Sequence, residues 1–451
     1  MLEPLYTADE MRAAEAGHDV DQLMARAGRA VAEEAMRRFP QARRFVAVCG
    51  GGANGGDGRI AVDVLKAAGR DAVASDDMTG ADVIIDALFG TGFHGEPRED
   101  AARQIEAINS ADAPVVAVDL PSGVNASTGE VEGACVDAEL TVTMHGRKVG
   151  LEIAPGRFHA GEVVVADIGL EQRETDNQLV TPAIVEQVPR KRPDQNKYSV
   201  GTVLVVGGSR GLTGAPSLAT EAAFRADAGY VAVAAPESTL PVLEQRLLEA
   251  VKLPCPEDDG KISPRAIEPI VEFAGKAGSV ALGPGLGRGP GPKEVVARLL
   301  AELEVPVVVD ADALFDLEPF ERSATTVLTP HEGELARLLG EDSRWVAAHR
   351  LEAVKRGAEK FRCICLLKGA DTLIVQPGSG VWVSPLGTPA LATAGSGDVL
   401  TGVTAAFLAK GLEAQTAAAA AAAACQLASK QIPQRGAVAS DVIHALPAAL
   451  D

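Results

Sequence analysis

Hydrophobic residues in this chain fall into short unbroken runs that alternate with longer segments of helical spacing. The runs Phe45–Cys49, Val83–Ile85 and Val115–Val118 are apolar throughout, which is typical of strands buried on both faces. Between them, apolar positions recur every three or four residues, as in an amphipathic helix. Repeated strand–turn–helix units of this kind produce a parallel sheet with helices on both faces.

Two helices are expected before the first strand. Residues 7–10 read Thr-Ala-Asp-Glu, a capping box that satisfies the unpaired backbone N–H groups at a helix start. Leu23, Ala27 and Val31 then recur at helical spacing and predict a second helix over 20–38. A third helix is expected over about 58–68, after a glycine-rich loop.

A second series of strands and helices occupies the later half of the chain. Its expected strands are 203–206, 230–234, 279–282, 307–309 and 365–367, and most of them end in glycine or aspartate. Because ligands of parallel sheets bind beyond the carboxyl ends of the strands, these polar ends mark candidate site positions.

The segment 171–199 separates the two series. It is polar and contains Pro-Arg-Lys-Arg-Pro, so neither the apolar strand runs nor the helical spacing continues through it. We therefore expect two three-layer α/β/α domains, over 1–178 and 185–451, the first with a Rossmann-like parallel sheet. In the second, the eight alanines at 417–424 are expected to form a closely packed buried helix.

Composition narrows the classes of function. The 451 residues carry a formal net charge of -20, so the overall field disfavours nucleic acid and anionic membranes as partners. No apolar run reaches membrane-spanning length. Six cysteines without a CxxC pair are typical of free thiols in a reducing compartment. The first residues lack the pattern of a signal peptide, and a cytoplasmic location is expected.

Polar residues gather at three strand ends in the first half. The glycine-rich stretch 50–58 follows one strand, and Asp86 and Asp119 end the next two. A glycine-rich turn that opens a helix suits phosphate binding. Asn54, Asp86 and Ser122 offer the oxygen ligands that hard cations prefer. Each acid alone is also an ordinary turn residue at a strand end.

The most informative stretch of the second half is Gly-Ser-Gly-Asp at 395–398. It precedes an alanine-rich helical pattern, and the N-terminus of a helix attracts anions. Asp398 would repel a phosphate there unless it takes a proton from a hydroxyl that attacks that phosphate. The alternative is a helix N-terminus in which Asp398 is a first-turn charge.

The motifs of the first half resemble the NAD(P)HX epimerase domain. They are Gly-Ala-Asn-Gly-Gly-Asp-Gly at 52–58, Asp-Ala-Leu-Phe-Gly-Thr-Gly at 86–92 and Val-Asp-Leu-Pro-Ser-Gly at 118–123. The resemblance implies a hydrated nicotinamide nucleotide as ligand, a potassium ion held by Asn54, Asp86 and Ser122, and Asp119 as the acid/base group. The implied ligand-binding residues are Ala53, Asn54, Gly55, Gly56, Asp57, Gly90, Thr91, Gly92, Phe93, His94, Gly95, Glu96 and Asp119.

Two features depart from that family's pattern. Ala53 stands where relatives usually have asparagine, which removes one side-chain hydrogen-bonding group but leaves the backbone amides. The stretch 73–80 is also short, where relatives carry roughly another strand and helix. The sheet is therefore expected to lack an edge strand.

The second half resembles the ribokinase-like NAD(P)HX dehydratase. The matching motifs occur in family order over about 250 residues and include Gly-Pro-Gly-Leu-Gly at 283–287, Thr-Pro-His-Glu-Gly-Glu at 329–334 and Lys-Gly-Ala-Asp-Thr at 368–372. The resemblance implies ADP or ATP as cosubstrate and magnesium in this domain. The implied contacts are Ala215, Gly285, His331 and Asp398 for the hydrated cofactor, and Lys368, Gly369, Ala370, Asp371, Thr372 and Gly397 for the adenine nucleotide.

Other interpretations of these residues stay open at this stage. His331 is also a suitable turn residue, and Lys368 a solvated lysine. Asp310 and Asp312 would serve a magnesium site or cap a turn, and Glu332 and Glu334 would serve either magnesium or the following helix.

The function expected from the two resemblances is repair of NADHX and NADPHX, by epimerisation in the first domain and nucleotide-dependent dehydration in the second. A homo-oligomer is expected, and no nucleic acid or membrane partner. One alternative is a kinase for a small hydroxymethyl substrate such as a vitamin precursor, because that class shares the Gly-Ser-Gly-Asp site. Another is a first domain that binds nucleotide without catalysis.

Overall fold

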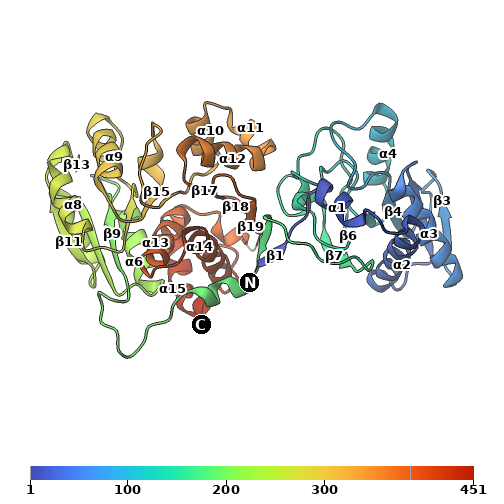
Figure 1. The fold of residues 1–451 in the computed structure, drawn as a ribbon, viewed down its shortest axis with the longest axis horizontal. Helices are drawn as coiled ribbons and strands as arrows, with labels where there is room; N and C mark the ends of the chain where they lie inside the picture. Colours follow the sequence, from blue (N-terminus) through green and yellow to red (C-terminus); the bar gives the residue numbers. More distant parts are fainter. Residues whose placement is uncertain (1, 386) are drawn as a thin grey trace. The chain divides into compact units, whose positions relative to one another are not determined.

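The computed structural model describes residues 2–385 and 387–451. The chain divides into two compact units, one built mainly from residues 4–178 and the other mainly from residues 179–451 (Figure 1).

The N-terminal unit is built around a six-stranded sheet in the order β3-β2-β4-β5-β6-β7, in which all neighbouring strands are parallel. Helices cover both of its faces, as the alternation of the strand residues requires: Ile85 packs with α2 and α3, and its neighbour Ile84 packs with α4. The elements are α1 (Ala8–Glu15), α2 (Val20–Arg38), β2 (Arg44–Cys49), α3 (Ala53–Ala67), β3 (Asp71–Ala74), β4 (Val83–Ala87), α4 (Glu99–Asn109), β5 (Val115–Val118), β6 (Leu140–Met144), α5 (Gly156–His159) and β7 (Glu162–Ala166).

The start of the third helix corrects the expectation from sequence. We expected a loop over 50–58 and a helix from about 58, but α3 begins at Ala53. Gly55 is required by close packing of the helix against the turn that precedes it: a Cβ there would lie 2.0 Å from the carbonyl oxygen of Gly50. The capping box at Thr7 and the helix over 20–38 are confirmed. The edge strand β3 leads directly to β4 through the short stretch 75–82.

The C-terminal unit is built around an eleven-stranded sheet in the order β1-β8-β19-β18-β17-β16-β15-β14-β9-β10-β11. Neighbours from β11 to β17 are parallel, and β17, β18 and β19 are antiparallel. Its strands are β1 (Leu2–Pro4), β8 (Gln178–Val180), β9 (Thr202–Val206), β10 (Tyr230–Pro236), β11 (Val251–Cys255), β14 (Ser279–Leu282), β15 (Val307–Val309), β16 (Thr326–Leu328), β17 (Ile364–Leu367), β18 (Thr372–Val375) and β19 (Val381–Ser384), and β12 (Glu257–Asp258) pairs with β13 (Lys261–Ile262).

Helices cover both faces of this sheet as well, so both units have the expected three layers (Figure 1). Val203 and Val205 of β9 pack with one helical layer, whereas Leu204 and Val206 pack with the other. The helices are α6 (Gly214–Arg225), α7 (Leu240–Arg246), α8 (Ile267–Ala274), α9 (Pro290–Glu302), α10 (Glu332–Leu339), α11 (Ser343–Ala348), α12 (Arg350–Phe361), α13 (Ser396–Ala409), α14 (Ala414–Ser429) and α15 (Ala439–Leu450).

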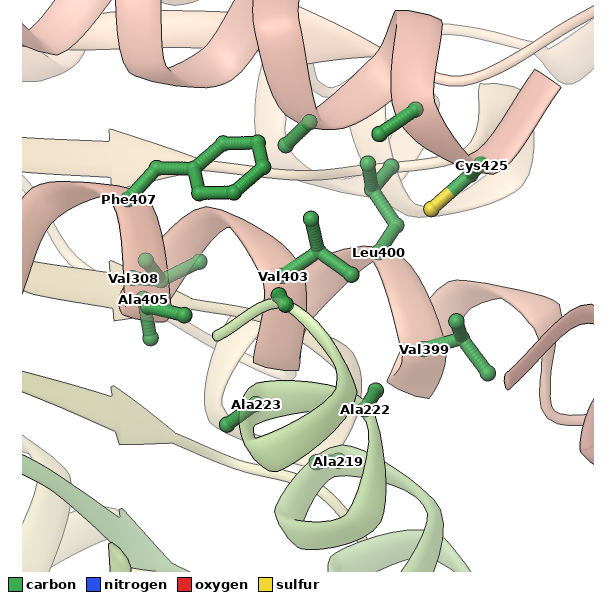
Figure 2. Packing of buried hydrophobic residues seen from close by; sticks show 14 of the residues in the cluster. Ala219, Ala222, Ala223, Val308, Val399, Leu400, Val403, Ala405, Phe407 and Cys425 are labelled. Carbon is green, nitrogen blue, oxygen red and sulfur yellow. The ribbon is translucent and has the colours of Figure 1, made fainter. Parts of the chain in front are cut away.

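The largest core cluster of this unit surrounds α13. Val399, Leu400 and Val403 project from it toward its neighbours, and Ala219 and Ala222 of α6 lie close by (Figure 2). All eight alanines at 417–424 are buried in α14, as expected. Small side chains let the helices approach closely, which holds the first turn of α13 firmly against the sheet.

Gly402 is the point of closest approach in this packing. A Cβ there would lie 2.1 Å from the backbone oxygen of Ala219, and backbone cannot move aside as a flexible side chain does. We expect Gly402→Ala to lower the free energy of unfolding by about 1–3 kcal/mol, measured by chemical denaturation of the full chain. Gly275→Ala is the control, because the nearest atom there is 3.5 Å away. Equal stability of the two variants would contradict this account.

Among residues 2–385 and 387–451, no helix is long and apolar enough to cross a membrane.

Candidate active sites

A cavity of about 890 Å³ opens beyond the carboxyl ends of β2, β4 and β5 in the N-terminal unit. Most of the residues that the resemblance implies in ligand binding line this cavity, whereas Gly55, Gly56 and Gly95 do not. Gly55 and Gly56 lie in α3, where neighbouring atoms leave no room for a Cβ. Those lining it are Ala53, Asn54, Asp57, Gly90, Thr91, Gly92, Phe93, His94, Glu96 and Asp119.

Asp119 is held in this cavity by a buried lysine. The Lys148 Nζ lies 2.6 Å from the Asp119 Oδ1 and also donates to the Thr143 hydroxyl and the Met144 carbonyl. The Thr91 N–H donates to the second carboxylate oxygen. Asp119 has a φ of 68°, a strained value for a residue other than glycine that is typical of functional positions.

Asn54, Asp86 and Ser122 come together around the backbone of Phe89. The Asn54 side-chain amide donates to the Phe89 carbonyl at 2.8 Å, and the Phe89 N–H donates to the Ser122 hydroxyl. That hydroxyl donates to the Asp86 Oδ1 at 2.6 Å. Asp86 is fully buried, and burial raises its pKa to about 6 in spite of three hydrogen bonds. The residues described show no ion pair that balances its charge.

Asp57 lines the same cavity from the first turns of α3. It is 8 % exposed, and its Oδ1 has no hydrogen-bond partner among the residues described. Burial, followed by the charges of Asp119 and Glu15, raises its pKa to about 8. Two carboxyl groups in different surroundings therefore face one cavity, because Asp119 has a lysine partner and Asp57 has none among the residues described.

The C-terminal site is centred on the first turn of α13. Gly395 is the N-cap with a φ of 90°, and Asp398 is the third residue of the helix. A Cβ on Gly397 would lie 3.1 Å from the Lys368 Nζ, so glycine leaves room for the lysine beside the free N–H groups of the helix end. Burial, then Asp310, raises the pKa of Asp398 to about 7, although Lys368 opposes this.

Lys368 is fixed by buried acids. Its Nζ lies 2.8 Å from the Asp310 Oδ1 and 3.8 Å from Glu334, and the Thr401 hydroxyl donates to the other oxygen of Asp310. Burial alone would lower the pKa of Lys368, but Asp310 and Glu334 outweigh it and raise the pKa. The lysine is therefore a cation at neutral pH, as phosphate binding requires.

The other implied contacts of this unit lie on loops that follow strands. His331 is the N-cap of α10 in a capping box with Glu334, and its ring is largely exposed. A Cβ on Gly285 would contact Ala215 at 3.3 Å, so these two positions are neighbours. In the segment 368–372, Gly369 and Ala370 are exposed, whereas Asp371 and Thr372 are buried.

Sequence reasoning did not single out several residues of these sites. Lys148 lies in Gly-Arg-Lys-Val-Gly at 146–150, a segment matched to the epimerase pattern, but nothing in the segment shows that the lysine reaches Asp119. Thr401 looks like an ordinary helix residue. Asp312 accepts from the Gly287 N–H and pairs with Arg288, so its capping role is supported.

Two α/β/α units with polar residues at strand ends and at helix N-termini define a two-domain nucleotide-handling enzyme. A family model described as NAD(P)H-hydrate dehydratase matches residues 203–448, and one described as YjeF-related protein N-terminus matches 20–75 and 65–150. The bifunctional NAD(P)H-hydrate repair enzyme of Moorella thermoacetica is 38 % identical over 94 % of this chain and 91 % of its own length. The chain belongs to the family of bifunctional NAD(P)H-hydrate repair enzymes.

Further similarities agree with this membership. The repair enzyme of Escherichia coli is 31 % identical over 98 % of this chain and 93 % of its own. The ADP/ATP-dependent NAD(P)H-hydrate dehydratase of Bacillus subtilis, crystallised with ATP and Mg²⁺, superimposes with a TM-score of 0.53 at 26 % identity and covers 60 % of this chain and 96 % of that one. The ribokinase-like fold and the epimerase–dehydratase pair expected from the motifs are confirmed, and the kinase alternative is not supported.

Proposed function

We propose that Asp398 is the base of a nucleotide-dependent dehydration in the C-terminal unit. The substrate carries a hydroxyl on C6 of the nicotinamide ring, and hydroxide is a poor leaving group. Asp398 accepts the hydroxyl proton while the oxygen attacks the terminal phosphoryl group of ADP or ATP, and the bond to the departing nucleotide breaks. The ring nitrogen lone pair then expels phosphate to give an iminium, and loss of a proton from the neighbouring C5 carbon restores the reduced cofactor.

The surroundings of Asp398 support this role. Its half-buried carboxyl lies in the first turn of α13, where the N–H groups of residues 394–397 would stabilise charge on the transferring phosphoryl group. Lys368 supplies a fixed positive charge beside it. The direct test mixes the purified chain with NADHX and ADP and follows recovery of nicotinamide absorbance together with free phosphate. Accumulation of a phosphorylated product in place of free phosphate would contradict dehydration.

The nucleotide-binding segment 368–372 and Gly397 are proposed to hold the adenine nucleotide, and Ala215, Gly285 and His331 the hydrated cofactor. Magnesium would neutralise charge on the nucleotide phosphates. Asp310 and Asp312 already have protein partners, so we propose that the metal is held chiefly by the nucleotide itself.

In the N-terminal unit we propose that Asp119 moves the proton that accompanies inversion at C6, so that both epimers become usable by the dehydratase. The carbon is bonded to both a hydroxyl and the ring nitrogen, so loss of water to an iminium and its return to the other face inverts it. The residues lining the 890 Å³ cavity would hold the nucleotide. Lys148 pairs with Asp119 and keeps it facing the cavity.

We propose that potassium binds at Asn54, Asp86 and Ser122. The donors are all hard oxygens, and the buried Asp86 carboxylate lacks a positive partner among the residues described. A cation there would fix the loop after β4, whose Gly90 and Thr91 line the cavity. It would thereby order the ligand-binding wall.

Asp86→Asn tests this potassium site. We expect the potassium concentration for half-maximal epimerase activity to rise roughly 10- to 100-fold, because the carboxylate is the only formal charge in the donor set. Activity is measured in potassium salts against tetramethylammonium salts of equal ionic strength. Dehydratase activity of the same chain is the control and should not change. An unchanged potassium dependence would exclude this site.

We also propose a cytoplasmic location and a homo-oligomeric assembly for this protein. The six cysteines are free thiols in the structure, which supports a reducing compartment such as the cytoplasm. Val242 on α7, Leu248 after that helix and Val251 on the edge strand β11 are exposed. Exposed apolar side chains on and before an edge strand support association into a homo-oligomer.

A further inference from the structure

The N-terminal cavity holds a second carboxyl group for which the single-carboxylate account gives no role. Asp57 lies on α3 and Asp119 follows β5, and both line the cavity. Asp57 is more than nine-tenths buried, and its Oδ1 makes no hydrogen bond among the residues described. A buried carboxyl group without a partner is costly, and it is retained typically where a ligand or a proton transfer uses it.

The charged groups around Asp57 are few. Asp119 and Glu15 contribute negative charge, and Lys148 is engaged by Asp119. From α2, the residues packed against this turn are uncharged: Met24 meets Gly56, and Gly28 lies against the backbone of Asp57 itself. Asp57 therefore has acidic neighbours and no cation of its own, and it keeps its proton to a higher pH than an ordinary aspartate.

We propose that Asp57 is the proton donor of the epimerase reaction, working as a pair with Asp119 across the bound nicotinamide ring. This role for Asp57 rests on the epimerase activity proposed above. It assigns the two proton transfers of that reaction to two carboxyl groups, where Asp119 alone was proposed before. Asp57 is thereby a catalytic acid in addition to a wall of the binding site.

The proposed epimerisation proceeds through an iminium at C6. Asp57 gives its proton to the C6 hydroxyl, the C6–O bond breaks, and water departs while the ring nitrogen lone pair forms the iminium. A water molecule attacks C6 from the opposite face, the new C6–O bond forms, and Asp119 takes the released proton. The enzyme is left with Asp57 ionised and Asp119 protonated, which is the form that converts the other epimer. Exchange with solvent restores the starting form.

Lys148 explains why the two groups differ. It lies 2.6 Å from the Asp119 Oδ1, whereas the residues described offer the Asp57 Oδ1 no hydrogen-bond partner. Two carboxyl groups that face one cavity from such different surroundings suit the separate roles of acid and base.

The test uses the full chain and the rate of interconversion of the NADHX epimers, with spontaneous epimerisation subtracted at each pH. Because burial raises the pKa of Asp57 to about 8, the wild-type rate should fall above that pH as the donor loses its proton. Asp57→Asn should lower the maximal rate about 100-fold or more with a smaller change in KM, and the remaining activity should lose the alkaline fall. Asp57→Glu should retain part of the rate.

Several outcomes would overturn the pair. A wild-type rate that stays level above pH 8 would do so without any variant, and so would an Asp57→Asn enzyme that changes only KM and keeps the alkaline fall. The unfolding transition of the N-terminal unit in the full chain, measured on the same preparations, reports that the variants are folded. Absence of enzymatic epimerisation in the wild type would instead remove the proposed activity itself, and the pair with it.

Discussion

Asp398→Asn is expected to lower dehydratase turnover by about 10³- to 10⁴-fold while nucleotide affinity changes little. Asparagine has nearly the same shape, but it cannot take the hydroxyl proton, and general-base catalysis contributes roughly this much. The N–H groups at the start of α13 and the Lys368 cation remain in place to bind phosphate. Turnover is followed by nicotinamide absorbance and nucleotide affinity by calorimetry.

The same residue sets an expected pH dependence. Burial and Asp310 raise the pKa of Asp398 to about 7. A base acts only when it is deprotonated, so wild-type turnover should decline as the pH falls through about 7 and should level off above it. This acidic fall should be absent from the residual rate of Asp398→Asn. Near-normal turnover in that variant would remove Asp398 from the mechanism.

Lys148→Met is expected to have the largest effect in the N-terminal unit, on stability as well as on epimerase activity. The lysine is fully buried and its ion pair with Asp119 is 2.6 Å long. Removing one member of such a pair leaves a buried charge unbalanced, which costs about 3–5 kcal/mol. We expect an earlier unfolding transition and loss of enzymatic epimerisation, with dehydratase activity retained below that transition.

A double variant separates the two effects of this substitution. Lys148→Met with Asp119→Asn carries no buried charge at this position, so most of the lost stability should return, whereas epimerase activity should not. Arg103→Met is the matched control, since that arginine pairs with Glu99 on the exposed surface of α4 and is expected to change stability by under about 1 kcal/mol. Stability of Lys148→Met equal to that of Arg103→Met would contradict the importance of the buried pair.

Local sequence patterns are sufficient to locate some strands of this fold and not others. Strands with continuous apolar runs, such as β2 and β5, were predicted almost to the residue, because strands buried on both faces need apolar side chains at every position. The three-residue strands β1 and β8 were not predicted, although they extend the C-terminal sheet. They lack the continuous apolar run that identified the equally short β15.

The site residues also fall into those that sequence motifs identify and those that only the fold brings together. Asp119 and Asp398 could be selected because each follows a recognisable motif at a strand end or a helix start. The environment that sets their chemistry could not. Lys148 follows Asp119 by 29 positions and meets it only because β6 lies beside β5 in the sheet, and Lys368 meets Asp310 from a different strand in a similar way.

The order of apolar runs, glycines and acids along the chain thus determined the layered architecture, the family and the two principal carboxylates, since those depend on residues close together in sequence. Only the tertiary structure decided which carboxylate has a cation beside it and which is buried alone. Electrostatic interactions and desolvation act through space and rise steeply as the surroundings exclude water, so they depend on neighbours brought together by strand order. That difference places Asp119 beside a buried lysine and leaves Asp57 buried among acidic neighbours, which raises the pKa of Asp57 to about 8.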